Sequence, residues 1–176
     1  MFIKSAFYNL KWLNQIKKLR GGSMNKSKRH SKITGDFGEY FVLYLLSKYG
    51  FECARIDYVG IDLYAKDNKT GKTLGISVKT KTLSPKKPTQ GIEIDSIERA
   101  KEACDVFGIL PYLAVVFDQE EYITVIMFPI SKIDEFCTTS KMKIRLDLKP
   151  QALHNYKNHP EVYYMRLRIE DNGFYK

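Results

Sequence analysis

Three polar side chains within residues 60–82 are spaced so that a pair of strands would gather them at one end of a sheet. The segment predicts a strand carrying Asp62, a turn at 68–71, and a second strand carrying Ser77 and Lys79. Because side chains alternate along a strand, each strand presents its polar residues on one face and its apolar residues on the other. A carboxylate, a hydroxyl and an ammonium that meet in this way would suit a hydrated Mg²⁺ ion and a phosphate group.

The apolar residues of the same two strands are expected to face the core. They are Ile61, Leu63 and Ala65 on the first strand, and Leu74, Ile76 and Val78 on the second. Gly60 permits a close approach of the chain or of a substrate beside Asp62, because it carries no side chain.

The composition indicates one folded domain, with or without an additional arm. The 176 residues are 44% hydrophobic, which is enough for a core, and no run approaches the roughly 18 apolar residues of a membrane span. The three cysteines are widely spaced and odd in number, and none of the three histidines pairs with one at metal-ligand spacing. The sequence therefore indicates neither a disulfide framework nor a zinc site, and it favours a reducing, cytoplasmic setting over a membrane.

The net charge of +9 lies entirely in the first 33 residues. Residues 1–33 hold nine Lys or Arg and no acid, whereas the rest of the chain holds twenty basic and twenty acidic residues. We therefore divide the sequence into a basic arm, 1–33, and a neutral domain, 34–176. A basic arm commonly contacts nucleic acid phosphates or an anionic surface; a solvated tail that only keeps the protein soluble is an equal alternative.

Residues 2–19 of the arm predict an amphipathic helix. Its apolar positions recur at helical spacing and are Ile3, Ala6, Phe7, Leu10 and Leu13. A Gly-Gly-Ser sequence ends the pattern, and Met24 offers an alternative start of the chain. Such a stripe most often docks on its own domain, while a membrane surface and a partner protein are the alternatives.

The domain predicts helices and strands in an order typical of an α/β or α+β sandwich. A helix is expected from Thr34, its N-cap, to Tyr49, and the strands at 112–118 and 122–128 are continuously apolar, as for strands covered on both faces. The other expected elements are a strand at 52–57, a polar loop at 83–91, a helix at 94–107, a short helix capped by Ser131 and Asp134, a strand at 142–147, a helix at 151–157 and a strand at 162–169. This order predicts a central mixed sheet between helices.

Four short motifs in a fixed order resemble the PD-(D/E)XK nuclease superfamily, which includes restriction endonucleases and archaeal Holliday-junction resolvases. The motifs are a helix with Gly-Glu, a strand with Gly-x-Asp, a strand with Val-Lys and a second helix, and they cover roughly residues 34–130. The resemblance implies an α/β fold with a three-layer, restriction-endonuclease-like core whose mixed sheet is flanked by helices. Residue by residue, it makes Glu39 the helix acid, Asp62 the metal-binding aspartate and Lys79 the lysine of the (D/E)XK element.

Ser77 departs from this pattern, because it stands where the (D/E)XK element has its acid. A serine does not supply the second carboxylate that a hard divalent cation prefers. Either the domain binds nucleic acid without cutting it, or the acid has moved. A subset of restriction enzymes in the superfamily has Ser-x-Lys on this strand and takes the acid from about a dozen residues downstream. In this chain that favours Glu93, with Glu98 a weaker substitute because its neighbours indicate a helix packed in the core.

The resemblance also implies a Mg²⁺ or Mn²⁺ ion and a role for each candidate residue. Asp62 and Glu93 would hold the ion, and Glu39 would hold a metal-bound water or a second ion. Lys79 would stabilise the phosphate charge and orient the attacking water, since phosphodiester hydrolysis needs a water in line with the leaving oxygen.

Five further side chains are expected to contact nucleic acid: Ser77, Lys81, Tyr64, Lys86 and Lys87. Lys81 shares the face of Lys79 and could hold a backbone phosphate, while Tyr64 could stack on a base or sugar. Lys86 and Lys87 lie in the loop beside the site, where a grip on DNA and a solvated loop are equal alternatives.

Three functional hypotheses follow. The leading one is a metal-dependent DNA endonuclease, and the second is a nuclease-fold protein that binds nucleic acid without cutting it. The third is an interaction module anchored by the 2–19 helix. Many members of the superfamily act as dimers, so a homodimer is an expectation that rests on the resemblance alone.

Overall fold

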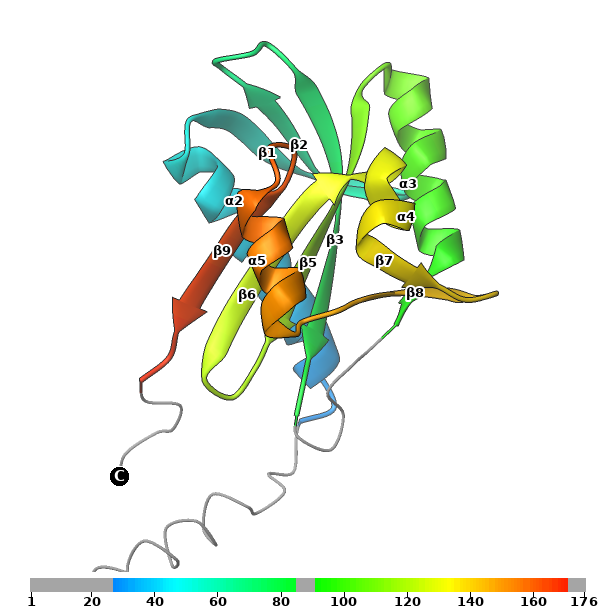
Figure 1. Ribbon diagram of the computed structural model, residues 1–176. Coiled ribbons are helices and arrows are strands. Elements are labelled where there is room, and N and C mark those ends of the chain that lie inside the picture. Colours follow the sequence, from blue (N-terminus) through cyan, green and yellow to red (C-terminus); the bar gives the residue numbers. More distant parts are fainter. Residues whose placement is uncertain (1–26, 85–90, 171–176) are drawn as a thin grey trace, which may run out of the picture. The chain divides into compact units, whose positions relative to one another are not determined.

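The computed structural model describes residues 27–84 and 91–170 (Figure 1). The sheet and its covering helices belong to the unit formed by residues 32–176. The expected helix at 2–19 and the loop lysines Lys86 and Lys87 lie outside the described residues.

Six strands form the central sheet, in the spatial order β1-β2-β3-β5-β6-β9. Their bounds are β1 Phe51–Tyr58, β2 Ile61–Asp67, β3 Thr73–Thr82, β5 Leu110–Asp118, β6 Tyr122–Pro129 and β9 Tyr163–Arg168. Only β3 and β5 pair in parallel, and the other four pairings are antiparallel. A parallel pair needs a crossover, which helix α3 (Ile94–Phe107) supplies. The predicted mixed sheet is therefore confirmed.

A second, small sheet has the order β4-β8-β7. It joins β4 (Ile92–Glu93), immediately before α3, to β8 (Lys143–Leu146) and β7 (Cys137–Thr139). The chain between the two sheets forms a 3-10 turn at Ile130–Lys132 and a short helix α4 (Ile133–Phe136). Helix α5 (Pro150–Asn158) leads into the edge strand β9.

Helices cover the central sheet on both faces. Helix α2 (His30–Lys48) buries Val42 and Leu46 against one face, and α3 buries Ala100 and Cys104 against the other. In Figure 1, α2 passes behind the sheet and α5 lies in front of it. Strand β5 is buried on both faces, and its side chains alternate between the two core clusters, as the continuous apolar run predicted.

Two glycine contacts bring both helices close to β3, the strand that carries Ser77 and Lys79. A side chain on Gly38 of α2 would collide with Thr80, and one on Gly75 of β3 would come within 2.5 Å of the Cys104 sulfur in α3. Because neither position has room for a Cβ atom, β3 is held tightly between the two helical layers.

Two predicted helix starts are wrong. Helix α2 begins at His30 rather than at Thr34, because the turn that opens it forms earlier, where the His30 N–H donates to the Ser27 carbonyl at 3.0 Å. The expected capping pair of Ser131 and Asp134 does not form. Pro129 ends β6 and leads directly into the 3-10 turn, so Ser131 lies inside that turn and α4 begins only at Ile133.

Strands β4 and β7 were not predicted, and one strand face was assigned wrongly. The two strands have two and three residues, too few for an alternating pattern to appear. Ile61 does not share a core face with Leu63 and Ala65. Ile61 packs in the cluster beneath α3, whereas Leu63 and Ala65 pack in the cluster beneath α2.

Candidate active site

The start of β2 is fixed by a tight turn and by α3. Gly60 has φ +103°, a conformation that side chains rarely adopt, and a Cβ atom there would collide with the backbone carbonyl of Arg99. The expected close approach beside Asp62 is therefore confirmed, and the chain segment that approaches is the backbone of α3. This contact places Asp62, the second residue of β2, beside the first turns of α3.

Strands β2 and β3 separate at Asp62. Their ladder ends at the pair Leu63–Ile76, whereas β3 continues along β5 as far as Thr82–Asp118. Beyond the last ladder pair, the Val78 N–H donates to Asp62 Oδ2 at 2.6 Å. The aspartate side chain thus replaces a backbone carbonyl in the fork between the two strands, and the change of face at Ile61 accompanies this separation.

The same fork holds Ser77 and Lys79. Lys79 Nζ donates to Ser77 Oγ at 2.9 Å and to the Val78 carbonyl at 3.2 Å, and it lies 3.7 Å from Asp62 Oδ2. Ser77 in turn donates to Asp62 Oδ2 over a long 3.5 Å. The structure therefore brings together the carboxylate, the hydroxyl and the ammonium on which the sequence argument was built.

Ser77 and its two partners differ in exposure. Ser77 is 1% exposed, so it bridges Asp62 and Lys79 from the interior and presents no surface to nucleic acid. The side chains of Asp62 and Lys79 are 29% and 28% exposed. Asp62 Oδ1 makes no hydrogen bond or ion pair within the described residues, so this oxygen is available to a ligand.

Lys81 extends the basic side of the fork toward Glu93. Burial and the nearby Lys79 lower the pKa of Lys81, while the carboxylate of Glu93 acts in the opposite direction. Glu93 is therefore within electrostatic range of Lys81. Its own ion pair is with Lys143 of β8, at 2.8 Å, and its side chain is 55% exposed.

Glu39 is engaged elsewhere. Its carboxylate accepts a 2.7 Å hydrogen bond from Arg55 Nε of β1, and the same guanidinium reaches Asp36 at 3.4 Å and lies over the ring of Tyr40. Within the described residues, no hydrogen bond or ion pair joins Glu39 to Asp62. The structure thus anchors the expected helix acid to Arg55.

The candidate metal ligands are not gathered into one cluster. Among residues 27–84 and 91–170, no three His, Cys, Asp or Glu side chains converge as a metal site would require. Asp62 and Glu93 nevertheless offer carboxylate oxygens, and Mg²⁺ keeps several waters and needs only one or two carboxylates. In the fork itself only Asp62 offers carboxylate oxygens, and Glu93 lies on β4 in its ion pair with Lys143.

The remaining expected residues are placed less centrally. Tyr64 is 38% exposed and lies opposite Gly75 in the β2–β3 ladder. The sequence argument missed Arg55 and Lys143, the partners of Glu39 and Glu93. No local signal indicates either, because each pair is joined only by the tertiary register of separate elements.

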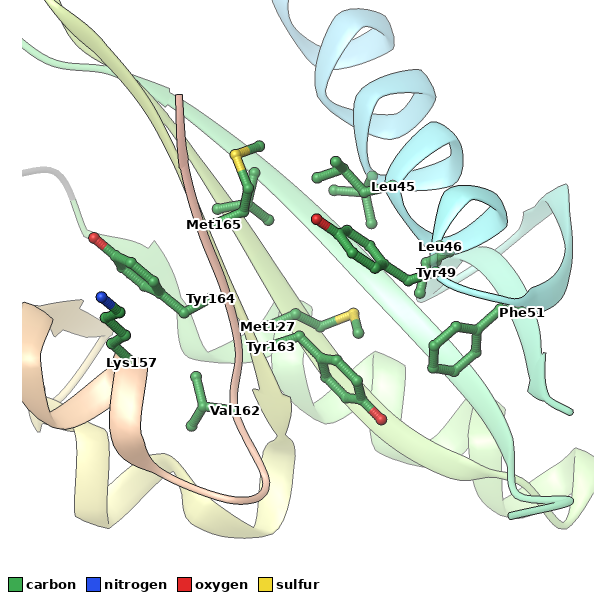
Figure 2. A pocket seen from close by; sticks show the side chains of 12 residues that line it. Leu45, Leu46, Tyr49, Phe51, Met127, Lys157, Val162, Tyr163, Tyr164 and Met165 are labelled. Carbon is green, nitrogen blue, oxygen red and sulfur yellow. The ribbon is translucent and has the colours of Figure 1, made fainter. Parts of the chain in front are cut away.

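An apolar cavity of about 340 Å³ lies on the α2 face, away from this fork. Figure 2 shows Leu45 of α2 and Tyr49, which follows the helix, facing Tyr163 and Met165 of β9 across it. Its lining carries no carboxylate, so it does not offer the ligands of a cation site. Within the described residues, no helix has the length and apolar character needed to cross a bilayer.

Comparison with known proteins identifies the fold. No protein-family model matches the chain, and no curated protein matches it in sequence. The chain is similar to the solved structure of Hjc, a Holliday junction resolvase from the archaeal hyperthermophile Archaeoglobus fulgidus. The TM-score is 0.50 and the sequence identity 20%, over 65% of this chain and 84% of that one. It also matches a restriction endonuclease in complex with substrate DNA, with a TM-score of 0.41 and 17% identity over 99% of this chain and 88% of that one.

At these sequence identities the similarity concerns the fold alone, and the fold assignment rests on the match to the resolvase. The predicted fold class is therefore confirmed: the chain has a restriction-endonuclease-like fold with a central mixed sheet between helices, similar to that of the resolvase.

Proposed function

We propose that this protein is a metal-dependent DNA endonuclease whose active site is the fork between β2 and β3. One observation supports this most strongly: Asp62, Ser77 and Lys79 meet where the β2–β3 ladder ends, within a fold that metal-dependent nucleases use. The fork combines an available carboxylate oxygen with an ammonium, which are the two kinds of group that hydrolysis of a phosphodiester requires.

Asp62 and Glu93 would hold the metal ion. Mg²⁺ or Mn²⁺, when bound there, supplies positive charge beside the phosphate and lowers the pKa of a water. The Val78 N–H and the Lys79 ammonium fix Oδ2 of Asp62 and leave Oδ1 directed away from these partners. Because Oδ2 is already bonded, Asp62 is orientated before any ligand arrives.

Lys79 would stabilise the negative charge that develops on the phosphate. Its ammonium is held by Ser77 and the Val78 carbonyl, so a small movement about its terminal bonds would turn one N–H toward a substrate oxygen. Lys81, one step further on the same side of β3, would hold a neighbouring backbone phosphate.

Ser77 keeps the charge of the fork in balance. A carboxylate at this buried position would place two negative groups beside one another, which is unfavourable unless a bound divalent cation offsets their charge. With serine there, Asp62 and Lys79 form a neutral pair, and the second carboxylate comes from Glu93 at the surface. This arrangement supports the migrated-acid hypothesis.

A second candidate function is DNA binding without cleavage. Two observations favour it: Glu93 is paired with Lys143, and Glu39 is paired with Arg55, so neither of these carboxylates is free in the structure. A homodimer and an intracellular location stay predictions from the resemblance and the composition.

Cleavage assays separate the two functions. Supercoiled, linear and branched DNA are incubated with Mg²⁺ or Mn²⁺ and with the wild type, Asp62→Ala or Glu93→Gln. Glu98→Gln is the matched control, because Glu98 is an exposed carboxylate of α3 with no ion pair within the described residues. The endonuclease proposal predicts cleavage by the wild type and the control and none by the other two variants. Salt-sensitive binding of DNA with no cleavage by any variant would support the second function instead.

A further inference from the structure

The ion pair between Glu93 and Lys143 lies within the small sheet, across the β4–β8 ladder. In the β4–β8 ladder the two residues are direct cross-strand partners, and their charged atoms lie 2.8 Å apart. The neighbouring pair, Ile92 and Ile144, is 2% and 1% exposed, so the backbone that carries the ion pair is anchored in the core. The register of the small sheet therefore fixes where Lys143 stands.

The stem of Lys143 is held as well. A Cβ atom on Gly91 would come within 2.7 Å of Lys143 Cδ, so the missing side chain at Gly91 makes room for the lysine stem. The Lys143 side chain is 44% exposed, which leaves its ammonium accessible to solvent. A half-exposed lysine with a packed stem loses little additional freedom when its ammonium changes partner.

Lys143 also lies within the electrostatic field of the fork. Together with burial and Lys79, it lowers the pKa of Lys81, whereas Glu93 raises it. Three lysines, two on β3 and one on β8, thus stand near one another, and Glu93 is the acid that balances them. A row of this kind is suited to consecutive phosphates of a nucleic acid backbone.

We propose that Lys143 is a phosphate-binding residue of this site. In the absence of a divalent cation, the carboxylate of Glu93 pairs with the Lys143 ammonium and keeps it from binding phosphate. When Glu93 turns toward a divalent cation, the ammonium of Lys143 is released to bind the DNA backbone. One side chain thereby couples loading of the cation to a stronger hold on DNA. The inference rests on the proposed function, because it places DNA in the fork.

A salt titration in EDTA tests whether Glu93 keeps Lys143 from binding DNA, without any cation or cleavage step. Binding of a labelled duplex is measured between 50 and 200 mM KCl for the wild type, Glu93→Gln, Lys143→Gln and the double variant. Lys141→Gln is the matched control. Lys141 is an exposed lysine two residues before Lys143 that makes no ion pair within the described residues, so the substitution removes an equal charge without touching the Glu93–Lys143 pair. Thermal unfolding of each variant checks the fold, and we expect small changes because the pair is half-exposed.

The proposal predicts that Glu93→Gln frees Lys143 and steepens the salt dependence by about one phosphate contact, which is roughly 3.5-fold in affinity over this fourfold range of salt. In the Lys143→Gln background, Glu93→Gln should leave the salt dependence unchanged. In the Lys141→Gln background, Glu93→Gln should still steepen it.

An equal effect of Glu93→Gln in the wild-type and Lys143→Gln backgrounds would overturn the proposal, because Glu93 would then act only as a general repulsive charge. No steepening in Glu93→Gln would overturn it too. Absence of cleavage in the separate assay would count against the endonuclease proposal and leave this binding result unaffected.

Discussion

Asp62 accepts a hydrogen bond from the backbone N–H of Val78 at 2.6 Å, at the point where strands β2 and β3 part. The carboxylate that we propose as a metal ligand is thereby part of the sheet itself. The bond satisfies an N–H of a residue that is only 6% exposed, and it orients the carboxylate oxygens. Asp62 therefore contributes a hydrogen bond to stability as well as the proposed metal-binding oxygen, and substitutions can separate the two contributions.

We expect Asp62→Ala to destabilise the protein more than Asp62→Asn. Alanine leaves the Val78 N–H without its acceptor, which costs about 1–3 kcal/mol, whereas asparagine keeps a carbonyl oxygen at that place. Urea unfolding at neutral pH measures the difference. Equal midpoints for the two variants would show that the hydrogen bond contributes nothing to stability, although both variants should lose the metal-binding charge.

The close approach of α3 to the β1–β2 turn predicts a large effect at Gly60. Gly60→Ala combines a positive φ with a collision against the Arg99 carbonyl, so we expect a loss of at least about 3 kcal/mol. Gly71→Ala is the matched control, because Gly71 has φ +72° in open space and should cost only about 1–2 kcal/mol. Comparable losses at the two positions would argue against the tight contact.

Glu39 is expected to matter less for cleavage than Asp62. Because its carboxylate is held by Arg55, we predict that Glu39→Gln lowers the cleavage rate by a much smaller factor than Asp62→Asn. Arg55→Gln should lower the thermal midpoint in the same direction as Glu39→Gln, and the double variant should be no worse than the sum. Loss of cleavage in Glu39→Gln equal to that in Asp62→Asn would assign Glu39 to the metal site after all.

Lys81 gives the DNA affinity a pH dependence. Burial and Lys79 lower its pKa below the usual lysine value of 10.5, so its positive charge is present at neutral pH and is lost as the pH rises, sooner than for an exposed lysine. The salt slope of DNA binding should therefore fall, by at most about one, as the pH rises toward the usual lysine value and the charge of Lys81 is lost. Lys81→Arg should keep the slope constant, because arginine stays charged over this range. An identical pH profile for both proteins would contradict a phosphate contact by Lys81.

Much of the fold follows from local patterns in the sequence. The continuous apolar runs of β5 and β6 predicted strands covered on both faces, and the helical spacing at 94–107 predicted α3 with its buried Ile97 and Cys104. By contrast, β4 and β7 are too short to show a period, and α2 starts from a turn in which the His30 N–H donates to the Ser27 carbonyl, upstream of the Thr34 cap that the sequence favoured. Face assignment failed at Ile61, where the strand leaves its ladder.

The candidate site divides in the same way. Alternation along β3 was sufficient to place Ser77 and Lys79 on one side, with Asp62 across the turn. Alternation could not predict the partners Arg55 and Lys143. Arg55 meets Glu39 because β1 packs near α2, and Lys143 meets Glu93 through the pairing of β8 with β4. Sequence periodicity describes one element at a time, and these ion pairs join two.

The most direct test is to move the second acid back onto β3. Cleavage of supercoiled DNA with Mg²⁺ is compared for the wild type, Glu93→Gln, and Glu93→Gln combined with Ser77→Asp. If Asp62 and Glu93 together hold the ion, the wild type cuts, Glu93→Gln does not, and the added aspartate beside Asp62 restores part of the activity. Cleavage by Glu93→Gln at the wild-type rate would contradict Glu93 as a metal ligand, and no cleavage by the wild type itself would contradict an active site in this fork.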